Sequence, residues 1–472
     1  MIRARRRFMA ILFLTAWMGF PGTSRAIQLP PTREVKLPNG ALLILAEKHD
    51  VPLIALRVSV RGGSIADPTG KEGVASITAG LLRKGAGKRS AQEIAALADG
   101  LGAYLYVGSG AELSYLSAGF MSRDLTVMLD LIADVLRRPT FPQDEFEKLR
   151  SQTVDEIASA KDDPSSVLPD YADAFFYADH PYARPTDGDE ATNKSLTRED
   201  VLSYYKGNYG GDRLIISVVG DFSSAAMESK IRAKLGDWAK VSEPWPKAPP
   251  AERHPGRRVL LVDKPDATQS YFWIGNLGVA RTDPDRIPLS VVNTAYGGRF
   301  TSILNTALRI EGGLTYGARV SAPRYVQAGT WAIVSYTKTE STEKAVDMAL
   351  QTLESLRSGG IPDTTLTSAK TYMIGQYPPT LETGNAIANA YADLAFYGQT
   401  REELERYTDR VAAVTVEDAK RVLARVTPPS SDLTFVFVGN AAAIRKVVSK
   451  YGPVTEIPIT EPMLSKLRVG RK

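Results

Sequence analysis

The 472-residue chain contains no cysteine and only three histidines, His49, His180 and His254. Without cysteine it can form neither a disulfide framework nor a thiolate metal site, and no lipid-modified cysteine can follow a leader. A hydrolytic zinc site draws several ligands from His, Cys and carboxylate side chains. No two of the histidines lie within four residues of each other. We therefore interpret them as ordinary loop residues.

Two sequence motifs, one of a catalytic nucleophile and one of a phosphate-binding loop, are also missing. The chain has no G-x-S-x-G nucleophile motif. The segment GAGKRS at 85–90 lacks both the glycine spacing of a phosphate loop and the Ser or Thr that follows its lysine. An independent hydrolase with an unrecognised site remains only as an alternative.

The N-terminus has the order of a secretory signal. Arginines between residues 3 and 7 precede an apolar run at 8–20, FMAILFLTAWMGF, and the small residues Ser24 and Ala26 follow. The run is too short for a membrane span, and the pattern predicts cleavage after Ala26 and export to the periplasm. An uncleaved N-terminal anchor is the alternative. After removal of the signal we expect no membrane span.

This segment also accounts for the basic charge. The formal net charge is +5, and residues 1–26 contain five arginines and no acid, so the mature chain is close to neutral. Net charge therefore gives no argument for a nucleic-acid partner. The composition, 43% hydrophobic and 24% charged, is that of a globular protein.

The two halves of the chain resemble each other. Three pairs of segments recur in the same order at nearly one separation, which indicates duplication of one domain. The pairs are LTREDV at 196–201 with VTVEDA at 414–419, 218 residues apart; LIISVVGD at 214–221 with LTFVFVGN at 433–440, 219 apart; and Pro142 with Pro362, 220 apart.

Between the halves lies the proline-rich stretch 239–256, AKVSEPWPKAPPAERHPG. So many prolines predict an extended, semi-rigid connector without a core of its own. The predicted organisation is a signal at 1–26, an N-terminal domain at 27–238, a linker at 239–256 and a C-terminal domain at 257–465.

Each half is predicted to be α+β. A Pro-Asn-Gly turn within 34–47 indicates a hairpin, and alternating apolar residues in 53–63 indicate a half-buried strand. A capping box, Ser90 with Glu93, opens a helix that ends at Gly100, and helical spacing continues in the segments from 123 to 164. We expect helices layered on a mainly antiparallel sheet, twice, forming a clam-like shell.

The helix GVASITAGLL at 73–82 begins with glycine and presents Ser76, Ala79 and Gly80. Its flanks and the element order resemble the insulinase/pitrilysin-like (inverzincin) zinc peptidases, in which such a helix carries H-x-x-E-H. Ser76 and Gly80 stand where the resemblance implies zinc-binding histidines, and Ala79 where it implies the catalytic Glu. These side chains cannot activate water, so we expect no metal site and no catalytic residue. Glu156, near the position of the family's further ligand, is interpreted as a helix-surface or packing acid.

Gly80 inside a helix costs about 1 kcal/mol relative to Ala. It is expected where another backbone packs closely or where a partner binds. The sequence leaves both explanations open.

The second half contains YGGRFTSILNTALRIEGGLTYGARV at 296–320. It is similar to the family's C-terminal motif, whose Arg and Tyr, seven residues apart, bind substrate and reach toward a zinc site in the other domain or subunit. The resemblance assigns substrate binding to Arg309 and Tyr316. From the residues alone, Arg309 is a cation ending a helix and Tyr316 a half-buried aromatic on a strand.

The resemblance implies a non-catalytic subunit of a periplasmic heteromeric zinc peptidase. The chain would supply substrate binding and half of a chamber to a zinc-bearing partner, with zinc in that partner only and a peptide as substrate. Alone it would bind no zinc and cleave no peptide. The alternative is a peptide-binding or scaffold protein that uses the same shell without proteolysis. The identity of the partner, the peptide, and a homodimer against a heterodimer stay open.

Overall fold

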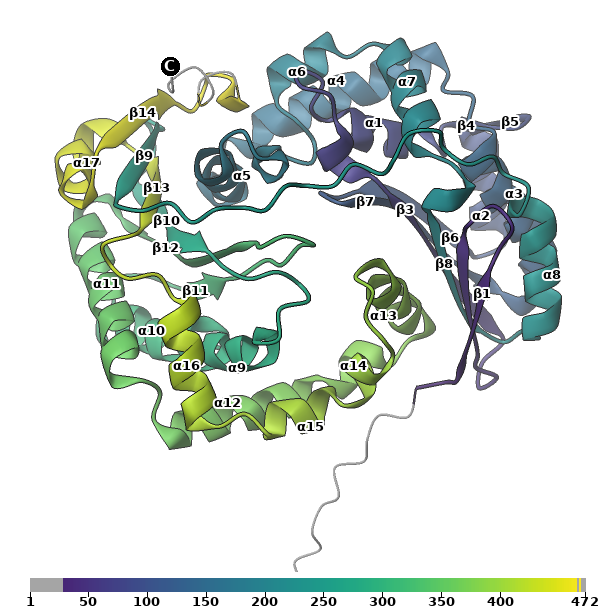
Figure 1. Cartoon of the computed structure of the whole chain (residues 1–472). Coiled ribbons are helices and arrows are strands. Elements are labelled where there is room, and N and C mark those ends of the chain that lie inside the picture. Colours follow the sequence, from purple (N-terminus) through teal and green to yellow (C-terminus); the bar gives the residue numbers. More distant parts are fainter. Residues whose placement is uncertain (1–28, 465–466, 468–472) are drawn as a thin grey trace, which may run out of the picture.

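A computed structural model describes residues 29–464 and 467 and contains two six-stranded sheets, one in each half of the chain (Figure 1). The strand order is β1-β2-β8-β3-β7-β6 in the first sheet and β11-β12-β10-β13-β9-β14 in the second. The predicted signal at 1–26 lies outside the described residues. The first sheet comprises β1 Thr32–Lys36, β2 Leu42–Glu47, β3 Leu53–Arg61, β6 Tyr104–Ser109, β7 Leu113–Met121 and β8 Leu214–Gly220; the second comprises β9 Arg258–Asp263, β10 Gln269–Leu277, β11 Ala318–Ser321, β12 Thr330–Lys338, β13 Thr434–Gly439 and β14 Val454–Pro458; β4 Gly85–Ala86 and β5 Arg89–Ser90 form a small ribbon.

The sheets confirm the predicted α+β class and the similarity of the halves. Most strand pairs are antiparallel, including the predicted hairpin β1–β2, whereas β2–β8 and β9–β13 are parallel. The outer strands differ. β1 pairs antiparallel with β2, but its counterpart in the second sheet is β14, which comes from the far end of the chain and pairs parallel with β9.

Helices pack on the sheets of both halves, and those predicted from 90 to 164 are confirmed. The capping box of Ser90 and Glu93 is present, and α2 ends at Gly100. The first half contains α1 Val74–Leu81, α2 Ala91–Gly100, α3 Leu125–Arg137, α4 Gln143–Ala160, α5 Pro164–Tyr177, α6 Glu190–Ser195, α7 Arg198–Asn208 and α8 Ser224–Leu235; the second contains α9 Arg286–Gly297, α10 Ile303–Asn305, α11 Thr342–Gly359, α12 Asp363–Gln376, α13 Gly384–Phe396, α14 Glu402–Glu405, α15 Tyr407–Ala412, α16 Val416–Val426 and α17 Ala441–Val448.

One helix from each half packs on the sheet of the other half. α5 contacts β10 and β13, while α13 contacts β3 and β8. Figure 1 shows both helices between the two sheets. Leu168 of α5 therefore shares a core with Trp273, and Ile387 of α13 shares one with Val219. Because each sheet is covered by a helix of the other half, the boundaries 27–238 and 257–465 remain a prediction.

The proline-rich connector contains no helix or strand between 238 and 257, yet it packs against both halves. Trp245 meets Phe396 edge-on with ring centroids 5.7 Å apart, and His254 meets Phe176 at 5.2 Å. Ala248 is buried. The stretch is extended, as predicted, and is fixed to its surroundings along its length.

A buried carboxylate, Glu112, joins the halves. It accepts hydrogen bonds from the hydroxyl of Tyr182 at 2.6 Å and from the backbone N–H of Val326, in the second half, at 3.0 Å. The Tyr397 hydroxyl, at the end of α13, donates a third at 3.4 Å. Burial raises the pKa of Glu112, and its hydrogen bonds oppose this rise.

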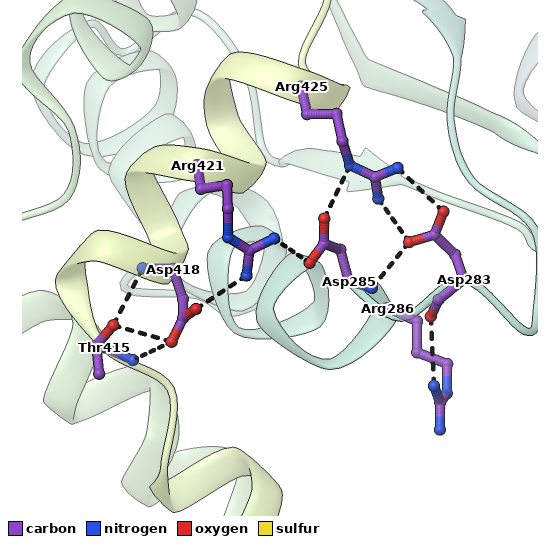
Figure 2. A network of polar contacts seen from close by, with 7 residues as sticks. All are labelled: Asp283, Asp285, Arg286, Thr415, Asp418, Arg421 and Arg425. Atoms are coloured by element: carbon purple, nitrogen blue, oxygen red, sulfur yellow. Dashed lines mark hydrogen bonds and ion pairs between the residues drawn. The ribbon is translucent and has the colours of Figure 1, made fainter.

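An ion-pair network holds α16 against the start of α9 (Figure 2). Arg425 contacts Asp285 at 2.8 Å and Asp283 at 2.5 Å, and Arg421 also pairs with Asp285. The two aspartates lie at the N-terminal end of α9, where the helix dipole favours negative charge. The network therefore fixes the helix that leads into the segment containing Arg309.

No helix in the described part of the chain is long and apolar enough to cross a membrane.

Candidate functional site

Two cavities lie on either side of α5. Cavity A, about 850 Å³, is lined by α5, the second sheet and the segment 297–300. Cavity B, about 570 Å³, is lined by α1, α4, α5 and the loop 185–190. Ser165 and Asp173 face cavity A, while Ser166 and Asp170 face cavity B. The helix is thus the common wall of both cavities.

Helix α1 forms part of cavity B and begins at a glycine for a structural reason. Gly73 has φ +97°, and a Cβ there would lie 2.6 Å from the backbone oxygen of Asp187. The carboxylate of Asp67 accepts hydrogen bonds from the backbone N–H groups of Gly73 at 2.8 Å and Ala75 at 3.0 Å. These bonds satisfy amides that a helix start leaves without partners.

The positions of the lost H-x-x-E-H motif have different surroundings. Ser76 lines cavity B and donates a hydrogen bond of 2.5 Å to Asp187. Ala79 is fully buried. Gly80 lines the cavity, and a Cβ there would lie 2.9 Å from Leu149 Cδ2. A side chain of α4, and not a backbone as one expectation had it, therefore packs on Gly80.

The wall of cavity B does not fit zinc. Glu156 is exposed on α4 and lines the cavity, as does Ser76, but no histidine does. Among residues 29–464 and 467, no group of three or more His, Asp or Glu side chains could hold a metal ion. The carboxylates of the wall are not grouped so that three of them could hold one ion, and without a histidine they do not make a tetrahedral zinc site.

Arg309 lies at the edge of cavity A. It belongs to a π-helical segment, Thr306–Glu311, that follows α10. Its Nη1 donates a 2.7 Å hydrogen bond to the backbone oxygen of Tyr316, and its guanidinium carbon lies 4.6 Å from the ring centre of Phe300. Its other guanidinium nitrogens have no hydrogen-bond partner in the described part of the chain. They are available to a ligand.

Tyr316 differs from its sequence-based description. β11 begins only at Ala318, so Tyr316 lies in the preceding loop, and its side chain is 77% exposed. It was expected, from the residues alone, on a strand and half-buried. The glycines Gly312 and Gly313 end the helix as predicted, but the chain stays irregular up to Gly317. Arg309 lines cavity A, whereas Tyr316 lies outside its wall.

In the structure, Arg309 thus contacts the backbone of Tyr316, and Ser76, Gly80 and Glu156 line the same cavity, cavity B. It does not bring the two sets together, because α5 separates cavity A from cavity B.

Sequence reasoning missed the acidic residues of the two cavities. Loss of solvent around its carboxyl and the charge of Asp187 raise the pKa of Asp170 to about 6, although the residue itself stays exposed at the cavity wall. Burial and the neighbouring Asp170 raise the pKa of Asp173 to about 8. Two aspartates three residues apart in a mostly apolar helix were the available signal. Asp187 lies in the loop before α6, in a stretch that contains no sequence motif.

The three histidines lie outside both cavities. His49 contacts Asp221 at 2.7 Å in a loop, and His180 contacts the backbone oxygen of Pro249 at 2.9 Å. The connector holds His254, which bonds to a backbone oxygen of α5. Their interpretation as loop residues is confirmed.

Comparisons with known proteins match both halves. Residues 42–190 match the family described as Insulinase (Peptidase family M16), and residues 195–373 match the family described as Peptidase M16 inactive domain. An uncharacterized zinc protease of Streptomyces coelicolor is 24% identical over 395 residues, covering 83% of this chain and 86% of the relative. The beta subunit of the mitochondrial-processing peptidase of Saccharomyces cerevisiae is 23% identical over 438 residues, covering 89% and 94%.

A solved structure shares the fold. The peptidase M16 inactive domain from Pseudomonas fluorescens superposes with a TM-score of 0.80 at 24% identity, covering 87% of this chain and 98% of that one. Both families, the relatives and the fold agree with each other. The chain therefore belongs to the insulinase family of zinc peptidases, peptidase family M16, as a member that has lost the H-x-x-E-H motif.

Proposed function

We propose that this protein is a non-catalytic subunit of a heteromeric zinc peptidase in the periplasm. A partner of the same family would bind zinc and cut peptides. This chain would complete the chamber and contribute Arg309 and Tyr316 to substrate binding.

The observation that carries the proposal is the contrast between the two cavities. In cavity B, Ser76 and Gly80 stand at positions where the family resemblance implies zinc ligands. Arg309 lies at the edge of cavity A, and its guanidinium has N–H groups without a partner among the described residues. A subunit that orients substrate needs the second feature and not the first.

The chemistry available to Arg309 is electrostatic. Its free N–H groups can bind a peptide carbonyl or carboxylate and stabilise the charge that develops when the carbonyl is attacked. Asp173 also lines cavity A, and burial raises the pKa of its carboxyl to about 8. The Tyr316 phenol is exposed and can donate one further hydrogen bond to a bound peptide or a partner subunit.

The relatives support a role as one part of an assembly. The yeast relative is named as the beta subunit of a processing peptidase, and the family matched at 195–373, which includes Arg309 and Tyr316, is described as an inactive domain. Export is supported by the predicted signal, because a protein with such a leader would reach the periplasm.

The test begins with the purified chain. It should contain no stoichiometric zinc and cleave no peptide, and the addition of a zinc-bearing partner captured from the periplasm should give chelator-sensitive cleavage. An Arg309→Ala, Tyr316→Ala double variant should assemble with that partner but lose its cleavage activity. Arg123→Ala, which changes a highly exposed arginine outside both cavities, is the matched control.

Two outcomes would contradict the proposal. Chelator-sensitive proteolysis by the chain alone would show that it is an independent enzyme. Full activity of the complex with the double variant would instead support the scaffold alternative. Fractionation of cells by osmotic shock tests the periplasmic location separately.

A further inference from the structure

A third cavity, cavity C, lies among the helices of the second half. It has a volume of about 360 Å³ and is lined by α9, α12, α15 and the segment that follows β11. The three helices contact one another and lie side by side in Figure 1. Within the segment, Pro323 and Tyr325 line cavity A, whereas Ala322 and Arg324 line cavity C. This alternation is that of an extended chain, so the segment separates the two cavities.

Arg324 is the charged residue of the described wall of cavity C, and most of its donors are unused. Its Nη2 donates a 2.9 Å hydrogen bond to the hydroxyl oxygen of Ser290. Its Nε is buried without a hydrogen-bond partner, and its Nη1 has none among the described residues. No described carboxylate lies within ion-pair distance of the guanidinium. Buried polar groups in folded proteins are normally satisfied, so these N–H groups indicate a ligand that accepts hydrogen bonds.

The surroundings of Arg324 do not balance its charge. Burial, together with the neighbouring Arg281 and Arg286, lowers the pKa of Arg324 to about 10. The guanidinium is therefore still charged at pH 7. The nearby acid, Asp283, is already paired with Arg425 at 2.5 Å. A partly buried cation without a counterion is costly, and a bound anion would remove that cost.

The rest of the wall is largely aromatic. Tyr372, Tyr377 and Tyr407 line the cavity, and the rings of the last two lie 4.1 Å apart between centroids. The Tyr377 hydroxyl donates to the backbone oxygen of Leu404 at 2.9 Å, whereas that of Tyr407 has no partner in the described part of the chain. The Tyr372 side chain is 44% exposed, so the cavity is open on its side. Such a wall fits a ligand with an aromatic or other apolar body.

Amide side chains complete the wall. Trp331 Nε1 donates a 2.8 Å hydrogen bond to Asn293 Oδ1, so the amide nitrogen of Asn293 is the group left without a described partner. The exposed amide of Gln376, at the end of α12, also makes no hydrogen bond to a described residue. Both can bond to the amide that precedes the carboxylate in a C-terminal amino-acid residue.

The number of cations selects the kind of anion. Arg281 and Arg286 stand outside the wall of cavity C, and Arg286 is paired with Glu403. A phosphate, which carries nearly two charges, would therefore meet one guanidinium only. A carboxylate carries one charge, and its two oxygens match the fork of one guanidinium.

We infer that cavity C is a binding site for a carboxylate attached to an aromatic group, either a free aromatic acid or the C-terminal residue of a peptide. Arg324 binds the carboxylate, and Tyr372, Tyr377 and Tyr407 contact the aromatic body. The inference concerns cavity C alone and does not depend on the roles proposed for Arg309 and Tyr316.

The test is calorimetric titration of the purified chain with N-acetyl-phenylalanine and with N-acetyl-phenylalanine amide, which lacks the carboxylate. The acid should bind at least about tenfold more tightly than the amide, because it alone forms charge-assisted hydrogen bonds with the guanidinium. Inorganic phosphate should bind more weakly than the acid. No binding of the acid, equal binding of acid and amide, or tighter binding of phosphate would overturn the inference.

Two further ligands distinguish the sources of the carboxylate. They are 3-phenylpropionate, a free aromatic acid, and the tetrapeptide GGGF with a free C-terminus. Tighter binding of the tetrapeptide would assign the site to the C-terminal residue of a peptide, through bonds to Asn293 and Gln376. Equal or tighter binding of 3-phenylpropionate would assign it to a free aromatic acid. Both outcomes support the inferred chemistry.

Variants locate the site. Arg324→Gln should weaken the binding of N-acetyl-phenylalanine by about 10- to 100-fold, the effect of losing a hydrogen bond to a charged group. Arg324→Lys should restore part of it, because an ammonium keeps the charge but lacks the fork. Arg123→Gln, the matched change at a highly exposed arginine outside the cavity wall, should leave the affinity unchanged. Unchanged affinity in Arg324→Gln would overturn the inference.

A second variant keeps the test decisive if Arg324→Gln does not fold. Tyr372→Ala changes a side chain that is 44% exposed, so the fold should tolerate it. It should weaken N-acetyl-phenylalanine severalfold through loss of aromatic contact, and far-UV circular dichroism checks that the variant is folded. Unchanged affinity in folded Tyr372→Ala would contradict binding of the aromatic group in cavity C.

Discussion

Arg309 Nη1 lies 2.7 Å from the backbone oxygen of Tyr316, and this hydrogen bond closes the loop that follows the glycine pair. The spacing of seven residues is therefore a local structural relationship. The guanidinium fixes the backbone that carries the tyrosine, while its remaining donors stay available at the edge of cavity A. One residue thus positions the other.

Replacement of Arg309 should separate activity from stability. We expect Arg309→Ala to lower kcat/KM of the assembled peptidase by about 100- to 1000-fold, the usual cost of losing a donor to developing charge. The free energy of unfolding should change by less than about 1 kcal/mol, because the hydrogen bond is solvent-exposed. Arg309→Lys should restore little activity, since an ammonium lacks the forked donors. Kinetics of the complex and denaturant unfolding of the subunit check both values; a large loss of stability would contradict this division.

The two glycines of α1 should respond in opposite ways to alanine. Gly73→Ala should lower the free energy of unfolding by more than about 2 kcal/mol, because φ is +97° and the backbone of Asp187 blocks the methyl group. Gly80→Ala should raise it by up to about 1 kcal/mol through helix propensity, since the flexible end of Leu149 can move toward cavity B. Urea unfolding of both variants decides this. A destabilised Gly80→Ala would show that Leu149 cannot move.

The contact between the halves should depend on Glu112. We expect Glu112→Ala to lower the free energy of unfolding by about 2–4 kcal/mol, because it leaves the Tyr182 hydroxyl and the Val326 N–H buried without an acceptor. Glu112→Gln keeps one acceptor and should cost less. Glu156→Ala, which removes an exposed carboxylate without a partner, is the control and should cost under about 0.5 kcal/mol. Equal loss in Glu112→Ala and the control would remove Glu112 from this role.

The raised pKa of Asp170 affects stability with a defined sign. The folded pKa of Asp170 is raised above the ordinary value of 3.8. The folded chain therefore binds more protons than the unfolded chain between about pH 4 and pH 6, and its stability should decrease as the pH rises through this range. Thermal unfolding of the chain and of its Asp170→Asn variant between pH 4 and pH 6 measures this difference.

Much of the fold could be predicted from local pattern. The hairpin at 34–47, the capping box at Ser90 and the end of α2 at Gly100 all depend on residues close in sequence, and all are present. The exchange of α5 and α13 between the sheets could not be predicted, because both helices have apolar faces that would suit either sheet. The prediction that Tyr316 lies on a strand was wrong, because β11 begins only at Ala318. Gly312 and Gly313 end a helix, but they do not specify where the next strand begins.

The sequence by itself determined which metal-binding and nucleophilic side chains this protein contains: three scattered histidines, no cysteine, and Ser76, Ala79 and Gly80 in place of a zinc motif. No arrangement of the chain can supply a side chain that the sequence lacks. Only the tertiary structure decided that Asp170, Asp187 and Glu156 surround one cavity while Arg309 edges another. These residues come from separate elements, and their proximity follows from how α5 is buried between two sheets, a long-range packing outcome that no local pattern specifies.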